Sequence, residues 1–99
     1  MDETTLRKQV DLGMKSKTVL DNEAVQKAFT DLRSAIYEKI EQVSIRDKDD
    51  LLELKRQLIA LNSFRGYLEK AVTDGSFAAS SLKHDKTIGE RIAQRLRIA

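Results

Sequence analysis

Hydrophobic side chains recur at steps of three and four residues over positions 21–43, the spacing of one face of an α-helix. The apolar positions are Val25, Phe29, Leu32, Ile36, Ile40 and Val43. Asp21 or Asn22 is a good N-cap, and Glu23 places a negative charge in the first turn. The pattern therefore predicts an amphipathic helix that begins at residue 21 or 22.

A second apolar stripe follows a short polar break at positions 44–47. Its main members are Leu51, Leu54, Leu58, Leu61, Leu68 and Val72. Ser44 or Asp47 can cap this helix, and Gly75 can adopt the left-handed conformation that ends one. Because the break is short, we expect an antiparallel helical hairpin over residues 21–75. The core predicted for this hairpin contains Phe29, Leu32, Ile36, Leu54, Leu58 and Leu61.

The two flanks of the hairpin carry weaker helical patterns. Residues 1–20 show a narrow stripe at Leu6, Val10 and Met14, interrupted by Gly13. That glycine destabilises a helix by about 1 kcal/mol relative to alanine, unless a neighbouring backbone approaches there. The small residues within 76–85 indicate a joint, and residues 86–99 a basic C-terminal helix with capping-box spacing at its start.

The fold class predicted is all-α, a central antiparallel helical hairpin with an additional helix at each end. The 99 residues contain no proline, and no segment alternates like a strand, so we expect one small helical domain over 1–99. The chain has no cysteine, so a disulfide cannot stabilise this short fold. We therefore expect a homo-oligomer or a complex with another protein.

Motifs of enzymes are missing from the sequence. It has no glycine-rich phosphate loop, no Gly-x-Ser-x-Gly and no His-Glu-x-x-His. His84, the one histidine, has no nucleophile nearby in the sequence, and the acidic run at 47–53 is also typical of a helix N-terminus. We expect no catalytic, cofactor-binding or metal-binding residue and no cofactor.

Positive charge gathers at the C-terminal end of the chain. Residues 76–99 hold five Lys and Arg against Asp85 and Glu90, a net charge of +3. We predict partner binding by the apolar residues Ile88, Ile92 and Leu96 together with Arg91, Arg95 and Arg97. The stripe taken alone favours packing of the apolar residues back onto the hairpin, and docking of the helix on phosphate, an acidic partner or a membrane surface is the other interpretation.

Two stretches of the sequence resemble a family of small helical-hairpin proteins encoded by tailed bacteriophages. They are the helix entry at 17–25, Lys-Thr-Val-Leu-Asp-Asn-Glu-Ala-Val, and the stretch at 68–78, Leu-Glu-Lys-Ala-Val-Thr-Asp-Gly-Ser-Phe-Ala, with Arg46-Asp47 between them. The resemblance covers residues 15–80. It implies a viral origin, a helical-hairpin fold and a place in a virion or its assembly, and it carries no functional residue.

Taken together, these patterns predict a non-enzymatic, phage-encoded interaction protein that oligomerises and binds other viral structural proteins. The alternative is a small nucleic-acid or nucleotide-binding protein that contacts phosphate through the C-terminal arginines. No window is apolar enough to span a membrane, and Met1-Asp2-Glu3 is unlike a basic signal-peptide start. We expect the protein in the virion or the host cytoplasm, and not secreted.

Overall fold

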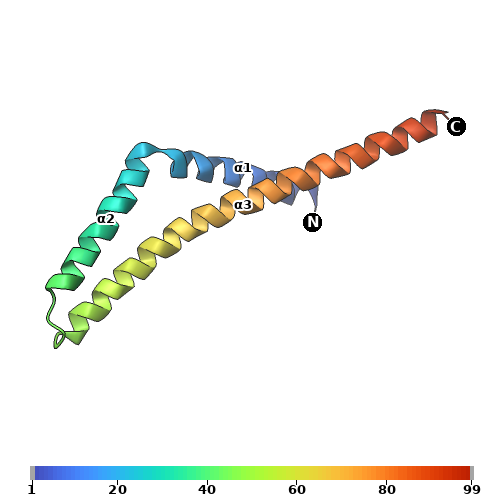
Figure 1. The fold of residues 1–99 in the computed structure, drawn as a ribbon. Helices are drawn as coiled ribbons and strands as arrows, with labels where there is room; N and C mark the ends of the chain where they lie inside the picture. The colour runs from blue at the N-terminus through green and yellow to red at the C-terminus, as the bar shows by residue number, and fades with distance from the viewer. Residues whose placement is uncertain (1, 99) are drawn as a thin grey trace.

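The computed structural model describes residues 2–98 and is all-helical over that range. Three helices follow one another along the chain: α1 (Glu3–Asp21), α2 (Glu23–Gln42) and α3 (Lys48–Ile98). The molecule is elongated, with principal extents of 80 × 26 × 16 Å. Figure 1 shows α1 and α2 as two short sides of an open triangle and α3 as its long side, which continues well beyond the triangle.

Asn22 forms the corner between α1 and α2. Its backbone N–H donates to the Val19 carbonyl oxygen at 3.2 Å, which closes the end of α1, while its side-chain oxygen accepts from the Val25 N–H at 3.1 Å. The Gln26 side chain also donates to the Leu20 carbonyl oxygen at 2.9 Å. One residue thus caps two helices, and the predicted start of the second helix is confirmed.

The turn between α2 and α3 lies where the sequence predicts it. Helix α2 ends at Gln42, and the Asp47 carboxylate accepts from the Asp50 N–H at 3.3 Å at the start of α3. The two helices then diverge (Figure 1). Phe29 of α2 reaches across to Phe64 of α3, with ring centroids 5.9 Å apart.

The predicted hairpin core is confirmed only in part. Phe29, Ile36 and Leu54 are buried, and Leu58 and Leu61 are half-buried, whereas Leu32 is 54% exposed. The reason is the divergence of the two helices: α2 meets α3 along a narrow line, so the edge of its apolar stripe stays in solvent.

The closest helix packing is between α1 and α3, which run antiparallel. Gly13 lies against Gly75, and a Cβ atom added at either glycine would lie 2.9 Å from the Cα atom of the other. Around this crossing, five more side chains are buried: Leu6, Ser16, Leu68, Ala71 and Ala78. A neighbouring backbone does approach Gly13, which accounts for a glycine in mid-helix.

The predicted face of the first helix is wrong in one respect. Met14 is 67% exposed, and the buried line passes instead through Leu6, Gly13 and Ser16. Small residues lie at this line because the two backbones could not come so close over larger side chains.

The predicted joint and the separate last helix are also wrong, because α3 is one continuous helix of 51 residues. Gly75 does not have positive φ, nor does any other residue from 2 to 98, so it does not end a helix there. The Thr73 and Thr87 hydroxyls donate to the carbonyl oxygens of Glu69 and Lys83, four residues back, as they do inside a helix. The prediction was a compact hairpin with a helix at each end, whereas the structure is an open triangle of helices in which α3 is one long helix. Met1 and Ala99, at the ends of the predicted domain, lie outside the described residues.

Candidate interaction surface

Residues 83–97 of α3, the C-terminal segment, extend past the N-terminus of α1, and beyond Lys86 no other described helix lies beside them (Figure 1). Every side chain of the segment is exposed. It keeps its helical form as the direct continuation of the packed part of α3, which ends with Ala78, 2% exposed, and the half-buried Leu82.

The predicted apolar residues lie together on this segment. Ile88, Ile92 and Leu96 follow one another at four-residue steps, so they form a continuous ridge along the helix. Their exposed fractions are 42%, 52% and 73%. The ridge does not pack back onto the hairpin, so the interpretation that the stripe alone favoured is wrong.

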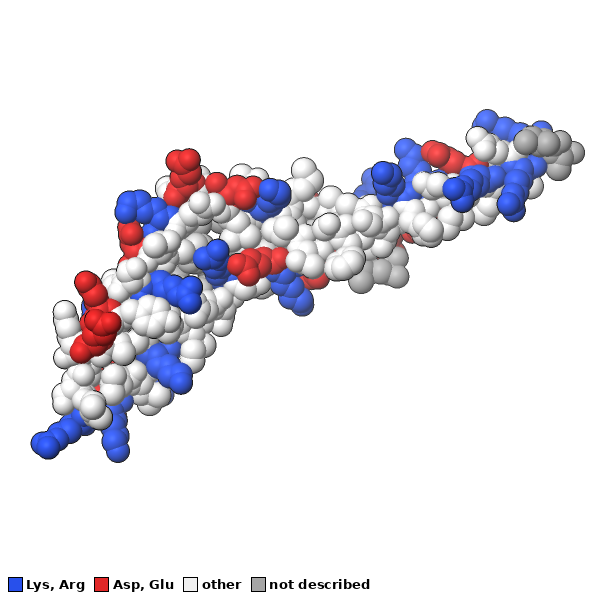
Figure 2. All heavy atoms as spheres, in the orientation of Figure 1, with Lys and Arg blue, Asp and Glu red and all other residues white. Residues whose placement is uncertain are grey.

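The three predicted arginines do not share one face. Arg91 and Arg95 are one turn apart and lie beside the apolar ridge. Arg97 follows Arg95 by two residues, about 200° around the helix axis, and so lies on another side. In Figure 2 the blue side chains at the far end of the molecule accordingly point in different directions.

None of the basic residues in the C-terminal segment forms an ion pair with another residue of the described chain. The ion pairs that occur are exposed contacts between residues three or four apart, elsewhere in the molecule, such as Arg65 with Glu69 at 3.0 Å. The positive charge of the segment is therefore free to meet a partner.

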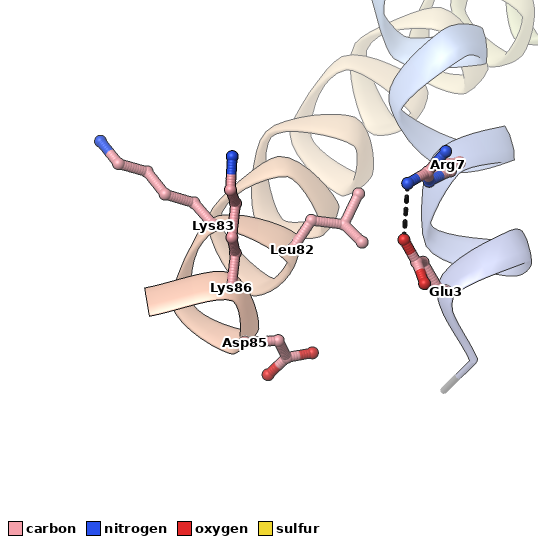
Figure 3. Close-up of a pocket in the computed structure, with 6 residues that line it drawn as sticks. All are labelled: Glu3, Arg7, Leu82, Lys83, Asp85 and Lys86. Atoms are coloured by element: carbon pink, nitrogen blue, oxygen red, sulfur yellow. Dashed lines mark hydrogen bonds and ion pairs between the residues drawn. The ribbon is translucent and has the colours of Figure 1, made fainter. Parts of the chain in front are cut away.

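A hollow of about 560 Å³ opens where α3 leaves α1, and sequence reasoning missed it. It is lined by Glu3, Arg7, Leu82, Lys83, Asp85 and Lys86. Figure 3 shows Leu82 pointing toward α1, while Arg7 forms an ion pair with Glu3 at 2.6 Å across one helical turn. Arg7 is thus already neutralised, and the hollow is an open fork between two helices with mixed charge.

His84 and the two tyrosines of the chain have exposed side chains. His84 is exposed and lies within α3. Tyr37 and Tyr67 are 45% and 61% exposed, and the Arg33 guanidinium lies 6.0 Å from the centre of the Tyr37 ring.

The acidic run at the start of α3 is a crowded helix N-terminus. A side-chain hydrogen bond with Asp47, together with the negative charges of Asp47 and Asp49, raises the pKa of Asp50. Across residues 2–98 the structure brings together no group of three or more His, Cys, Asp or Glu side chains that could hold a metal ion.

No helix among the described residues is both long and apolar enough to cross a membrane. No protein-family model, curated protein or solved structure matches the chain.

Proposed function

We propose that this chain is a non-enzymatic helical interaction protein that self-associates and binds other proteins through its C-terminal segment. The observation that carries the proposal is the exposed ridge of Ile88, Ile92 and Leu96 on a helix end that no other part of the described chain covers. Covering apolar surface contributes about 25 cal/mol per Å², so such a ridge favours association. On the basis of the phage resemblance, we propose a virion or its assembly as the setting and other viral structural proteins as the partners.

The charges of the segment fit the rim of such a contact. Arg91 and Arg95 flank the ridge, where charged residues steer association and add little to the affinity. Arg97 lies on another side of the helix, so the three arginines do not form one compact phosphate-binding surface. For this reason we place the nucleic-acid role second.

The test compares two variants of the full chain that carry changes on different sides of the same segment. In the first, Ile92→Glu and Leu96→Glu place charges on the ridge; in the second, Arg91, Arg95 and Arg97 become Ala. Light scattering at micromolar concentration should give a multiple of 11.3 kDa for the unchanged chain. We expect the first variant to be a monomer and the second to keep its association.

Fluorescence anisotropy with labelled DNA and RNA tests the alternative in the same variants. Submicromolar binding at physiological salt that disappears in the arginine variant would contradict the proposal and establish a nucleic-acid partner. Such binding would also weaken steeply with salt, in proportion to the number of phosphates that the protein neutralises.

A further inference from the structure

A hollow of about 240 Å³ lies between α2 and α3, which diverge from their turn (Figure 1). Phe29, Arg33 and Tyr37 of α2 follow one another at four-residue steps along one wall, and Arg65 of α3 lies in the other wall. No Asp or Glu of residues 2–98 lines this hollow. It is therefore a basic and aromatic site between two helices, in a different part of α3 from the C-terminal segment.

Each arginine of the hollow lies over an aromatic ring. The Arg33 Cζ atom is 6.0 Å from the centre of the Tyr37 ring, and the Arg65 Cζ atom is 5.9 Å from the centre of the Phe29 ring. A guanidinium group over a ring is attracted to the negative charge of the ring face, and the N–H groups at its edge stay free to donate. Both arginines are thus partly ordered before a ligand binds, which lowers the entropy cost of binding.

The positive charge of the hollow is only partly neutralised within the described chain. Arg33 forms no ion pair with any residue from 2 to 98, because its neighbours one turn away on the same side of α2 are Phe29 and Tyr37. Arg65 donates to Glu69 through its Nε atom at 3.0 Å, so its two terminal nitrogen atoms remain available. Glu69 itself lines the neighbouring hollow and not this one.

A phosphate monoester is the anion that fits this set of donors best. Planar guanidinium groups bind phosphate through pairs of parallel hydrogen bonds, and the Thr30 and Ser34 hydroxyl groups lie in the same wall as Arg33. A phosphate monoester carries about −1.5 to −2 charges at pH 7, which matches two guanidinium groups, whereas a carboxylate carries a single charge. Pockets that enclose a whole small ligand measure about 300 to 1,000 Å³, so this smaller hollow receives the charged group and leaves part of its carrier outside.

The Tyr37 ring indicates what carries the phosphate. The residue is 45% exposed, and exposed aromatic rings and arginine planes are surfaces on which nucleic-acid bases stack. We propose that this hollow binds a nucleoside monophosphate, with the phosphate between Arg33 and Arg65 and the base stacked on Tyr37. The inference goes beyond the proposed function and does not depend on it, because the C-terminal segment contributes no residue to the hollow.

Isothermal titration calorimetry of the full chain with adenosine monophosphate tests this site at about 50 mM salt. Ribose 5-phosphate, which lacks the base, and adenosine, which lacks the phosphate, are the comparison probes. We expect a Kd of about 10 µM to 1 mM for adenosine monophosphate. Ribose 5-phosphate should bind at least about ten-fold more weakly, because it cannot stack, and adenosine should bind more weakly still, because it has no charge for the arginines.

Three variants locate the site on the molecule. Arg33→Gln removes the arginine without an ion pair, and we expect it to raise the Kd for adenosine monophosphate at least about ten-fold. Arg33→Lys keeps the charge and loses the planar fork, so it should restore only part of the affinity. Arg56→Gln is the matched control, since Arg56 is also an exposed helical arginine but does not line the hollow, and it should change the Kd less than about two-fold.

The proposal is overturned if adenosine monophosphate does not bind up to about 5 mM, if Arg33→Gln binds it like the control, or if ribose 5-phosphate binds as tightly. It is also overturned if binding survives in Arg33→Gln and disappears when Arg91, Arg95 and Arg97 become Ala, because the ligand would then lie on the C-terminal segment. A single-stranded oligonucleotide that binds through Arg33 at least about a hundred-fold more tightly would identify a nucleic acid, and not a mononucleotide, as the ligand. Circular dichroism confirms that each variant is folded, and Arg33 is exposed, so its replacement should leave the helices intact.

Discussion

Replacement of Gly75 by alanine tests the central packing of the molecule, because two effects oppose each other there. In mid-helix, alanine is favoured over glycine by about 1 kcal/mol, so helix propensity alone predicts a more stable protein. The structure predicts the reverse. The new Cβ would lie 2.9 Å from both the Gln9 carbonyl oxygen and the Gly13 Cα atom, closer than non-bonded carbon atoms approach in proteins.

The magnitude follows from which atoms must move. Both obstructing atoms belong to the backbone of α1, so neither can turn aside as the end of a flexible side chain can. The helices must separate by several tenths of an ångström, which loosens the packing of the buried Leu6, Ser16 and Ala78. Overpacking of this kind destabilises by about 1 to 3 kcal/mol, and we expect the upper half of that range, which leaves a net loss of about 1 to 2 kcal/mol.

Gly66→Ala is the matched control, since a Cβ there meets nothing within 4 Å in the same helix. The propensity gain is common to both variants, so the difference between them, about 2 to 3 kcal/mol, measures the strain at the crossing. Urea denaturation followed by circular dichroism gives the free energy of unfolding of both variants at the same protein concentration. If Gly75→Ala were as stable as Gly66→Ala, the close crossing of α1 and α3 would be refuted.

Two further predictions concern the other end of the triangle. Leu54→Ala should lower the free energy of unfolding by about 2 to 4 kcal/mol, because Leu54 is buried. Leu32→Ala should lower it by less than about 1 kcal/mol, because Leu32 is 54% exposed. Similar losses for the two variants in urea denaturation would contradict the packing of α2 on α3. The pKa of Asp50 is raised in the folded state, so the folded state loses stability when rising pH ionises this carboxyl beside Asp47. Asp50→Asn should therefore raise Tm at neutral pH, and it should leave Tm unchanged below about pH 3, where the carboxyl is protonated. An unchanged Tm of Asp50→Asn across this pH range would contradict the crowding of Asp47, Asp49 and Asp50 at the start of α3.

Helix starts and periodic stripes could be predicted from the sequence because their signals are local. Asn22 and Asp47 each have a short side chain that accepts from an N–H three residues on, and the structure contains both hydrogen bonds. The three- and four-residue spacing around Phe29 and Ile36 correctly indicated the inner side of α2. Each of these features needs only the residues within one or two turns.

The long third helix could not be predicted in the same way, because the local signals at its middle are ambiguous. Thr73-Asp74-Gly75 has the composition of a helix end, yet Gly75 is where α1 crosses, and a glycine serves either purpose. Whether Gly75 ends a helix or allows α1 to pack closely depends on Gly13, sixty-two residues away in the sequence. The seven-residue step from Leu68 through Gly75 to Leu82 is the signal that favours continuation.

For a related reason, the sequence alone could not predict that the C-terminal ridge is exposed to solvent. Ile88, Ile92 and Leu96 have the spacing of a core-facing stripe, and spacing alone does not say whether the chain contains a helix to cover them. That question is settled by length. Helices α1 and α2, of 19 and 20 residues, cannot between them cover a helix of 51 residues.

The distribution of buried residues along α3 is the basis for proposing that the ridge binds a partner. Among the described residues, the last buried side chain is Ala78 and the last half-buried one is Leu82, so nothing beyond Leu82 contributes to the packing of the triangle. A segment needed only for solubility or for capping would gain nothing from Ile88, Ile92 and Leu96, which expose apolar surface to water. Fifteen further residues that maintain a regular helix with an exposed apolar ridge are consistent with the proposal that a second molecule covers this surface.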